Sequence, residues 1–88
     1  MIRISREAER RLIRRLRRLQ GQARGVERMI QEGRDCQEVL EQLAALRAAA
    51  HQAFLFAARA YVQACVREDA ARSEEAVRVL LATLQRLP

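Results

Sequence analysis

The stretch from Asp35 to Val66 constrains the fold more than any other part of the chain. It contains no glycine and no proline, and it is crowded with alanine, leucine, glutamine and glutamate. This composition favours an uninterrupted helix. Its apolar residues recur at steps of three and four, which places them on one helix face. They are Cys36, Val39, Leu40, Leu43, Leu46, Ala50, Phe54, Ala58, Tyr61, Val62 and Cys65. The stretch predicts one long helix from Cys36 to about Val66.

Both cysteines lie in this helix, 29 residues apart. At about 100° per residue they return to within about 20° of the same face, and at about 1.5 Å per residue they are about 43 Å apart. In a continuous helix they cannot meet within one chain, but they would meet in an antiparallel pair of chains. Cys36 would begin the helix beside Arg34, and a helix N-terminus and a nearby cation both favour the reactive thiolate. The alternative is that each cysteine is an inert packing residue.

Two other side chains of the long helix bear on its chemistry. Tyr61 lies one turn before Cys65 on the same face, and we expect its phenol to be packed and hydrogen-bonded. His51 is the only histidine and lies near the middle of the helix. It is about 20 Å along the axis from either thiol. We therefore interpret His51 as a packing or surface residue rather than a metal ligand.

The first helix is expected to start after Ser5, whose side chain can accept a hydrogen bond from the first turn. It runs to about Glu32 and stops at Gly33, because glycine readily adopts the left-handed conformation that ends helices. Asp35 then caps the long helix, and Glu38, three residues later, completes a capping-box-like pair. The turn between the two helices is very short, which predicts an antiparallel hairpin.

The end of the chain predicts a third, shorter helix. We expect the charged segment Arg67–Arg72 to be a connector, and Ser73 to cap a helix from Glu74 to about Arg86. The expected fold class is all-α, with a long antiparallel helix hairpin and a short C-terminal helix in one domain of residues 1–88. A chain of 88 residues buries little surface, so we expect at least a dimer with a four-helix bundle core.

The composition also bears on the cellular context. The chain has no uncharged apolar run of about 18 residues, so we expect no membrane span. Residues 1–20 are rich in arginine and lack the apolar segment of a signal peptide. A cytoplasmic location follows as an expectation. Cysteines there serve as sensing, metal-binding or catalytic thiols more often than as structural disulfides.

Positive charge is concentrated in the first third of the chain. All 17 basic residues are arginine, and residues 1–34 carry a net charge of +7 whereas residues 35–88 carry −1. On a helix, most of the early arginines fall opposite the leucine stripe. They are Arg10, Arg14, Arg17, Arg18, Arg24 and Arg28, with Arg11, Arg15 and Gln22 on the flank. This face predicts binding of double-stranded DNA, with arginines on phosphates and Gln22 on a base edge.

Other interpretations of the basic face stay open. RNA is less favoured, because the stretch lacks aromatic platforms for base stacking. An anionic membrane surface is also less favoured, because no bulky aromatic anchors line the apolar side. The remaining alternative is a solvated surface helix. Gly21 and Gly25 lie near the same face, and they indicate either close approach by DNA or a neighbouring helix, or simply tolerated helix glycines.

Four short motifs follow one another along the first two helices. They are Arg15-Leu-Arg-Arg-Leu-Gln-Gly-Gln-Ala-Arg-Gly-Val26, Met29-Ile30, Arg34-Asp-Cys-Gln-Glu-Val-Leu-Glu-Gln-Leu43 and Ala64-Cys-Val66. Their order and spacing resemble the copper-sensitive operon repressor (CsoR) family over about residues 5–87. The resemblance implies an all-helical repressor, a homodimer of antiparallel hairpins that assembles into a homotetramer. Ligand chemistry at its dimer interface releases DNA. The implied DNA-binding residues are Arg15, Arg18 and Gln22, with Arg14 and Arg47 as further candidates.

The resemblance also assigns a sensor site. Copper-sensing members hold Cu(I) with a cysteine at the start of the second helix and a His-x-x-x-Cys pair near its end from the other protomer. The corresponding positions are Cys36, Tyr61 and Cys65, so the histidine is missing. That departure argues against a three-ligand Cu(I) site and against the nickel/cobalt and formaldehyde branches. It favours the persulfide-sensing (CstR) branch, in which reactive sulfur species link the two thiols across protomers.

We therefore predict a repressor that senses persulfide or polysulfide through Cys36 and Cys65, needs no cofactor and derepresses sulfur-detoxification genes. The alternative within the same family is a Cu(I)-responsive repressor that binds the metal with the same two thiolates. An enzyme is not favoured, because no carboxylate–histidine pair is spaced for acid–base work. A structural disulfide-linked dimer without a DNA role is the remaining class, and it predicts little salt-sensitive binding to duplex DNA.

Overall fold

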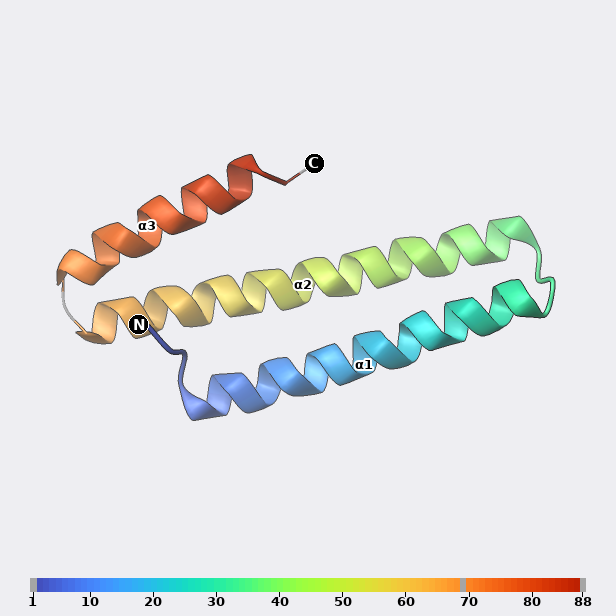
Figure 1. Ribbon diagram of the computed structural model, residues 1–88, viewed down its shortest axis with the longest axis horizontal. Coiled ribbons are helices and arrows are strands. Elements are labelled where there is room, and N and C mark those ends of the chain that lie inside the picture. The colour runs from blue at the N-terminus through green and yellow to red at the C-terminus, as the bar shows by residue number, and fades with distance from the viewer. Residues whose placement is uncertain (1, 69, 88) are drawn as a thin grey trace.

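Three helices make up the protein in a computed structural model that describes residues 2–68 and 70–87. They are α1 (Arg6–Gln31), α2 (Cys36–Glu68) and α3 (Ala70–Gln85), and the described residues include no strand. α1 and α2 form a long antiparallel hairpin, and α3 folds back along α2 (Figure 1). The predicted all-α class and the hairpin with a shorter C-terminal helix are confirmed.

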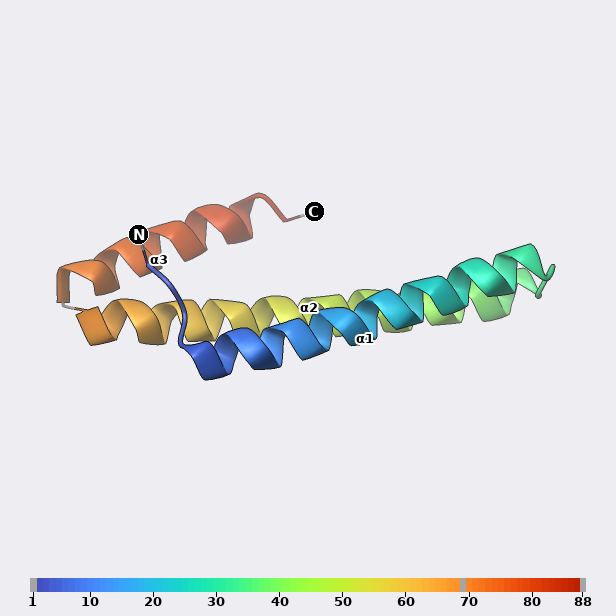
Figure 2. The ribbon, with the colours of Figure 1, turned by 60° about the horizontal axis from the view of Figure 1, so that its bottom comes forward.

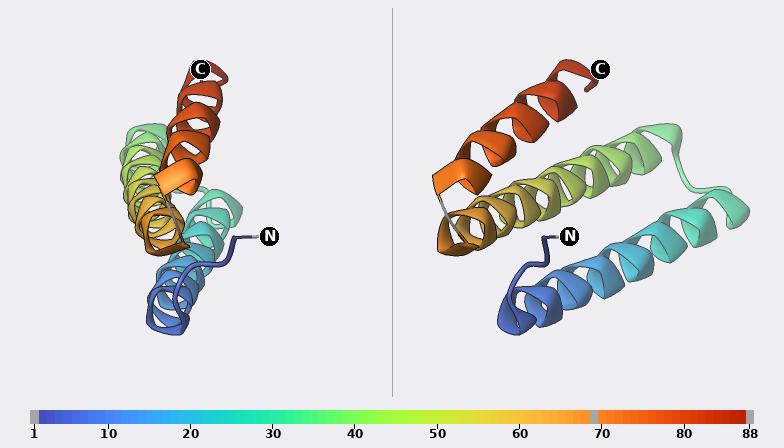
Figure 3. Two further views of the ribbon diagram at one scale, coloured as in Figure 1. Left: turned by 90° about the vertical axis from the view of Figure 1, so that its left-hand side faces the viewer. Right: turned by 60° about the vertical axis from the view of Figure 1, so that its left-hand side comes forward.

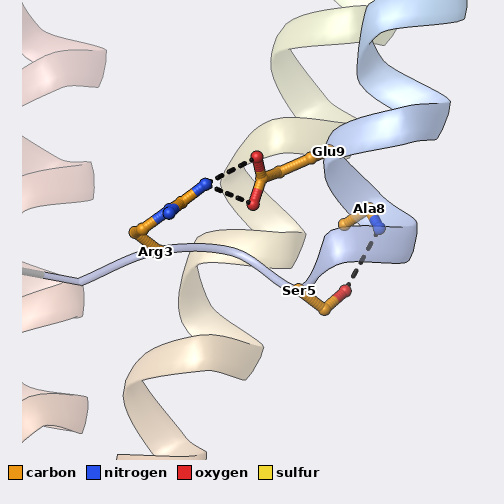
Figure 4. A network of polar contacts seen from close by, with 4 residues as sticks. All are labelled: Arg3, Ser5, Ala8 and Glu9. Atoms are coloured by element: carbon orange, nitrogen blue, oxygen red, sulfur yellow. Dashed lines mark hydrogen bonds and ion pairs between the residues drawn. The ribbon is translucent and has the colours of Figure 1, made fainter.

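The start of α1 is held by local polar contacts. The Ser5 side chain accepts a hydrogen bond from the backbone N–H of Ala8 at 3.1 Å, as expected for an N-cap residue. The Arg3 guanidinium donates to both carboxylate oxygens of Glu9, each at 3.0 Å. Figure 4 shows these contacts where the chain enters the helix. The predicted cap at Ser5 is confirmed.

The turn between α1 and α2 closes with paired backbone hydrogen bonds. Gly33 has a φ of 72°, its N–H donates to the Ile30 carbonyl at 3.1 Å, and the Arg34 N–H donates to the Met29 carbonyl at 3.0 Å. This is the Schellman pattern, which needs a residue free to adopt positive φ. The predicted stop at Gly33 is confirmed, and the turn reverses the chain within a few residues.

The start of α2 differs in one detail from the predicted capping box. Asp35 Oδ2 accepts from the backbone N–H of Gln37 at 3.2 Å, so Asp35 is the cap. Glu38 accepts from Arg34 Nε at 2.9 Å instead of from the Asp35 backbone. The prediction of a reciprocal box was wrong because a guanidinium four residues away outcompetes a backbone N–H for the carboxylate.

The predicted connector between α2 and α3 was wrong for the residues that the structure describes. α2 continues to Glu68, α3 already begins at Ala70, and Ser73 lies inside α3 instead of capping it. Asp69, part of the same prediction, lies outside the described residues. Arg72 pairs with Glu75 within α3 at 2.7 Å, and an ion pair at a spacing of three stabilises a helical turn. Arg72 also reaches Glu68 at 3.5 Å, which joins the start of α3 to the end of α2.

α2 is the central element of the protomer. α1 and α3 each pack against α2 and do not contact one another in the described part of the chain. They lie on different sides of α2, as Figure 2 and the end-on view in Figure 3 show. The molecule measures 53 × 28 × 15 Å, so it is about one helix thick in its shortest direction.

A molecule this thin cannot enclose a large core. The buried apolar residues are Val26, Ala53, Ala60, Ala64, Cys65 and Ala76. Parts of the predicted apolar stripes stay open to solvent, including Leu16 at 47% exposed, Leu43 at 43% and Leu40 at 60%. Large exposed apolar area on a small domain marks an interaction surface.

Candidate DNA-binding surface and sensor thiols

A shallow groove follows one side of the α1–α2 hairpin. One hollow of about 200 Å³ is lined by Arg15, Arg18, Leu19, Gln22, Ala49 and Gln52. A second, of about 280 Å³, shares Arg15 and Arg18 and is lined also by Arg11, Arg14 and Phe56. A third shares Arg11 and Phe56 and adds Arg59 and Gln63. The shared residues make the three hollows adjoin, and together they are called the hairpin groove below.

The groove brings together most of the predicted DNA-binding residues. Arg14, Arg15, Arg18 and Gln22 all line it. Arg47 is exposed but belongs to none of the three hollows. It precedes Gln52 by five residues, which places it about 140° around α2 from the groove-lining side. The fold therefore separates Arg47 from the other candidates.

α2 contributes groove residues that the sequence analysis missed, among them Gln52, Phe56 and Arg59. Their spacing of four and three places them on one face of the helix, which is a signal present in the sequence. The sequence analysis considered the apolar stripe of α2, which lies on the opposite side of the helix. Which α2 face borders the arginines of α1 depends on how the hairpin packs.

The groove carries unpaired positive charge. Arg11 pairs with Glu7 at 3.3 Å. Within the described residues, Arg14, Arg15, Arg18 and Arg59 form no ion pair with a carboxylate. Unpaired guanidinium groups in a concave surface concentrate positive potential and attract polyanions. The arrangement fits a phosphate backbone.

Arg15 differs from its neighbours on α1. It is half-buried, whereas Arg14 and Arg18 are exposed. Its guanidinium carbon lies 5.1 Å from the centroid of the Phe56 ring. An arginine within about 6 Å of an aromatic face makes a cation–π contact. This contact joins the basic helix α1 to α2 at the middle of the groove.

The two glycines of α1 have open space around them. An added Cβ on Gly21 or Gly25 would meet no atom within 4 Å. Close approach by a segment of the same chain therefore does not explain these glycines.

The two thiols lie far apart on one helix. α2 is continuous from Cys36 to Glu68, so the thiols are separated by about 43 Å along its axis. The predicted separation within one chain is confirmed. Both cysteines are free, with Cys36 exposed and Cys65 buried. Cys65 is 0% exposed, and Glu75 and Arg72 of α3 act on Tyr61, one turn before it, so the second thiol lies on the side of α2 that faces α3.

Tyr61 interacts directly with Cys65. Burial raises the pKa of the Tyr61 phenol, and so do its side-chain hydrogen bond with Cys65 and the negative charges of Cys65 and Glu75, while Arg72 opposes them. The phenol therefore stays protonated at neutral pH beside the Cys65 side chain. The expectation of a packed, hydrogen-bonded phenol agrees with this environment.

The side chains near Cys36 differ from those near Cys65. Arg34 is close in sequence, but its guanidinium pairs with Glu38 at 2.9 Å, and both side chains are 49% exposed. His51 is exposed and stacks on Phe54, with ring centroids 6.3 Å apart and an interplanar angle of 28°. His51 therefore lies near neither thiol. Among the described residues of one chain, no three His, Cys, Asp or Glu side chains gather as a metal site would require.

None of the described helices is long and apolar enough to cross a membrane.

A family model described as metal-sensitive transcriptional repressor matches residues 8–86. The chain is also similar to a crystal structure of the copper-sensing repressor CsoR with Cu(I) from Geobacillus thermodenitrificans. That likeness has 29% identity and a TM-score of 0.77, and it covers 98% of this chain and 92% of the other. No curated protein matches. With nearly its whole length matched, this chain belongs to the family of metal-sensitive transcriptional repressors, a family of regulators and not of enzymes.

Proposed function

We propose that the protein represses transcription by binding duplex DNA through the hairpin groove, and that reactive sulfur species release it through Cys36 and the partner subunit's Cys65. One observation carries the sensing half of this proposal. α2 is a single helix that presents two free thiols on nearly the same face about 43 Å apart. Only a second chain can bring such thiols together.

The exposed apolar surface supports an antiparallel partner. α3 covers the half of α2 that contains Cys65 and leaves the other half bare (Figure 1). On the bare half, Leu40 is 60% exposed and Leu43 is 43% exposed, and Cys36 shares the exposed end. Pairing this half with a second hairpin would complete a four-helix core. In that homodimer each Cys36 approaches the partner's α2–α3 region, and two dimers would form the tetramer.

The proposed chemistry proceeds in two exchange steps. The Cys36 thiolate attacks the terminal sulfur of a persulfide RSSH, which forms a Cys36 persulfide and releases RS⁻. The thiolate of the partner subunit's Cys65 then attacks Sγ of the persulfidated Cys36 and breaks its bond to the outer sulfur. An inter-subunit disulfide forms and HS⁻ leaves, so the persulfide is the oxidant and both thiols are oxidised. The exposed thiol reacts first, because Cys65 is 0% exposed until α3 shifts.

One helix, α2, connects the thiols with the proposed DNA-binding groove. α2 carries both cysteines and also contributes Gln52, Phe56 and Arg59 to the hairpin groove. A crosslink that displaces α2 relative to α1 therefore changes the groove directly. The two grooves of a dimer would also lose their alignment on the duplex. We propose that this misalignment lowers DNA affinity.

Cu(I) is the second candidate inducer. The similar repressor from Geobacillus thermodenitrificans is described as copper-sensing and was solved with Cu(I), which favours this interpretation. Cys36 and the partner subunit's Cys65 would supply two thiolates, which are soft ligands suited to Cu(I). Tyr61 adds no soft donor, because its phenol stays protonated and hydrogen-bonded to Cys65. A copper site here would therefore rest on the two sulfurs.

A duplex selected from a random library by the reduced protein provides the DNA for the test. The protein is treated with polysulfide or, separately, with Cu(I), and DNA affinity is measured by fluorescence anisotropy. We expect polysulfide to weaken binding and to produce a crosslinked dimer on a non-reducing gel. Cys36→Ala should abolish the crosslink. If copper alone weakens binding, the sulfur proposal is wrong and the copper interpretation replaces it.

A further inference from the structure

We propose that Phe56 is a positioning residue for DNA binding, which holds the Arg15 guanidinium in the middle of the hairpin groove. This inference rests on the proposed DNA-binding role of the groove. It concerns an aromatic residue of α2 that makes the arginine of α1 ready to bind a phosphate. Nothing in the sequence pattern of α1 alone indicates such a residue.

The contact is specific within this chain. The Arg15 guanidinium carbon lies 5.1 Å from the Phe56 ring centroid. The chain has three aromatic rings of the Phe and Tyr type. Phe54 stacks with His51, and Tyr61 hydrogen-bonds Cys65. Phe56 is thus the ring that meets the basic groove, and it lines two of the three hollows.

The geometry of a cation–π contact leaves the arginine competent to bind phosphate. The Arg15 guanidinium carbon lies over the Phe56 ring, and phosphate oxygens accept hydrogen bonds from the N–H groups along the edge of a guanidinium. The Arg15 guanidinium has no carboxylate partner in the described residues, so these N–H groups are available. Phe56 therefore orients Arg15 without competing for its donors.

Holding the side chain before DNA arrives lowers the entropy lost on binding. A long arginine side chain gives up rotamer freedom when it engages one phosphate. Arg14 and Arg18 are exposed and have no such restraint, whereas Arg15 is already half-buried against α2. Arg15 should therefore contribute more to affinity than its two neighbours. Because the restraint comes from α2, it also depends on how α2 is placed relative to α1.

The test is a double-mutant cycle on DNA affinity. Phe56→Leu removes the ring and keeps apolar volume, whereas Phe56→Tyr keeps the ring. We expect Phe56→Leu to weaken binding about 2- to 5-fold for each groove that contacts the duplex, which is the range of an exposed cation–π contact. Phe56→Tyr should bind like the wild type. In an Arg15→Ala background, Phe56→Leu should cause no further loss.

Two additional readouts separate positioning from a purely structural role. In the free protein, the Arg15 δ-protons should show an upfield ring-current shift in NMR spectra, and Phe56→Leu should remove it. Circular dichroism melting checks that the variant folds. If Phe56→Leu does not fold, Phe56→Met takes its place in the cycle, and the ring-current shift of the wild type still tests the contact.

The outcomes distinguish this inference from the proposed function. If Arg15→Ala leaves DNA affinity unchanged, the groove is not the DNA surface and the proposed function fails at that point. If Arg15→Ala weakens binding but Phe56→Leu does not, the positioning role is wrong and the DNA surface stands. An equal loss from Phe56→Leu in both backgrounds also overturns the positioning role, because Phe56 would then act independently of Arg15.

Discussion

At the scale of single residues, local charge and burial separate side chains that look alike in the sequence. Arg15 and Arg47 are both arginines on long helices, but Arg15 lies in the hairpin groove against Phe56 whereas Arg47 lies outside it. Cys36 and Cys65 share a helix face, but one is exposed and the other is buried. Their chemistry is therefore expected to differ.

Arginine substitution tests the assigned DNA surface. We expect Arg15→Ala to weaken DNA binding about tenfold or more, because it removes a charge-assisted hydrogen bond to a phosphate. The slope of log affinity against log salt should fall by about 0.9 for each phosphate that the variant no longer neutralises. Arg47→Ala removes the same charge from outside the groove and serves as the matched control. Equal reductions in affinity for the two variants would show that net charge, and not the groove, governs binding.

Glycine substitution tests the backbone of α1. We expect Gly21→Ala and Gly25→Ala to raise the free energy of unfolding by up to about 1 kcal/mol each, because an added Cβ meets no atom within 4 Å. Gly33→Ala should instead destabilise the protein, because Gly33 has a φ of 72° and alanine is strained there. Thermal melting measures all three. A destabilised Gly21→Ala or Gly25→Ala variant would indicate a close contact with a second chain.

At the scale of helices, the contact between α2 and α3 is expected to limit access to the second thiol. Cys65 and Ala76 are both 0% exposed, and ion pairs from Arg72 to Glu68 and Glu75 span the end of α2 and the start of α3. Attack by or on Cys65 requires local opening of this contact. In the proposed mechanism, the stability of this contact would therefore set the rate of the resolving step.

A matched pair of substitutions in α3 tests this expectation. Ala76→Leu inserts a large side chain where no space exists, which destabilises packing by about 1–3 kcal/mol. We expect the rate of Cys65 alkylation in a Cys36→Ala background to rise about tenfold or more. Ala82→Leu makes the same change at an exposed position of α3 and should leave the rate unchanged. A similar rate in both variants would mean that α3 does not limit access.

At the scale of the whole molecule, the protomer is incomplete as a folded unit. Its shortest dimension is 15 Å, and the uncovered apolar residues on all three helices include Ile13, Leu16, Leu40, Leu43, Val77 and Leu81. A layer of helices stabilises itself by burying its apolar faces against another layer. The same association is what brings the two distant thiols within reach in the proposed mechanism. In that mechanism, stability and sensing would depend on one interface.

Two leucines with equal exposure test where that interface lies. Leu43 and Leu55 are both 43% exposed, but twelve residues separate them, which is about 120° around α2. Leu43→Glu places a charge on the bare face beside Cys36 and should dissociate the dimer in analytical ultracentrifugation. It should also prevent the polysulfide-induced crosslink. Leu55→Glu should leave the dimer intact, and the reverse pattern would place the dimer interface on the other side of α2.

The sequence by itself determined the helices and the spacing of the thiols along one of them. Ser5, Gly33 and Asp35 act within four or five residues, and such local bonds can be predicted from residue type. The segment after Glu68 could not be predicted so well, because its charged residues suggest a loop. In the fold, Arg72 instead pairs with Glu75 within α3 and with Glu68 at the end of α2.

The tertiary structure alone decided which residues meet across helices. Phe56 reaches Arg15 although 41 residues separate them in the sequence, and Cys65 is buried in the region where α2 meets α3. Helical periodicity indicates that a face is apolar or basic but not which other face it contacts. That choice depends on the packing of distant segments, which settled the composition of the groove and the unequal exposure of the two thiols.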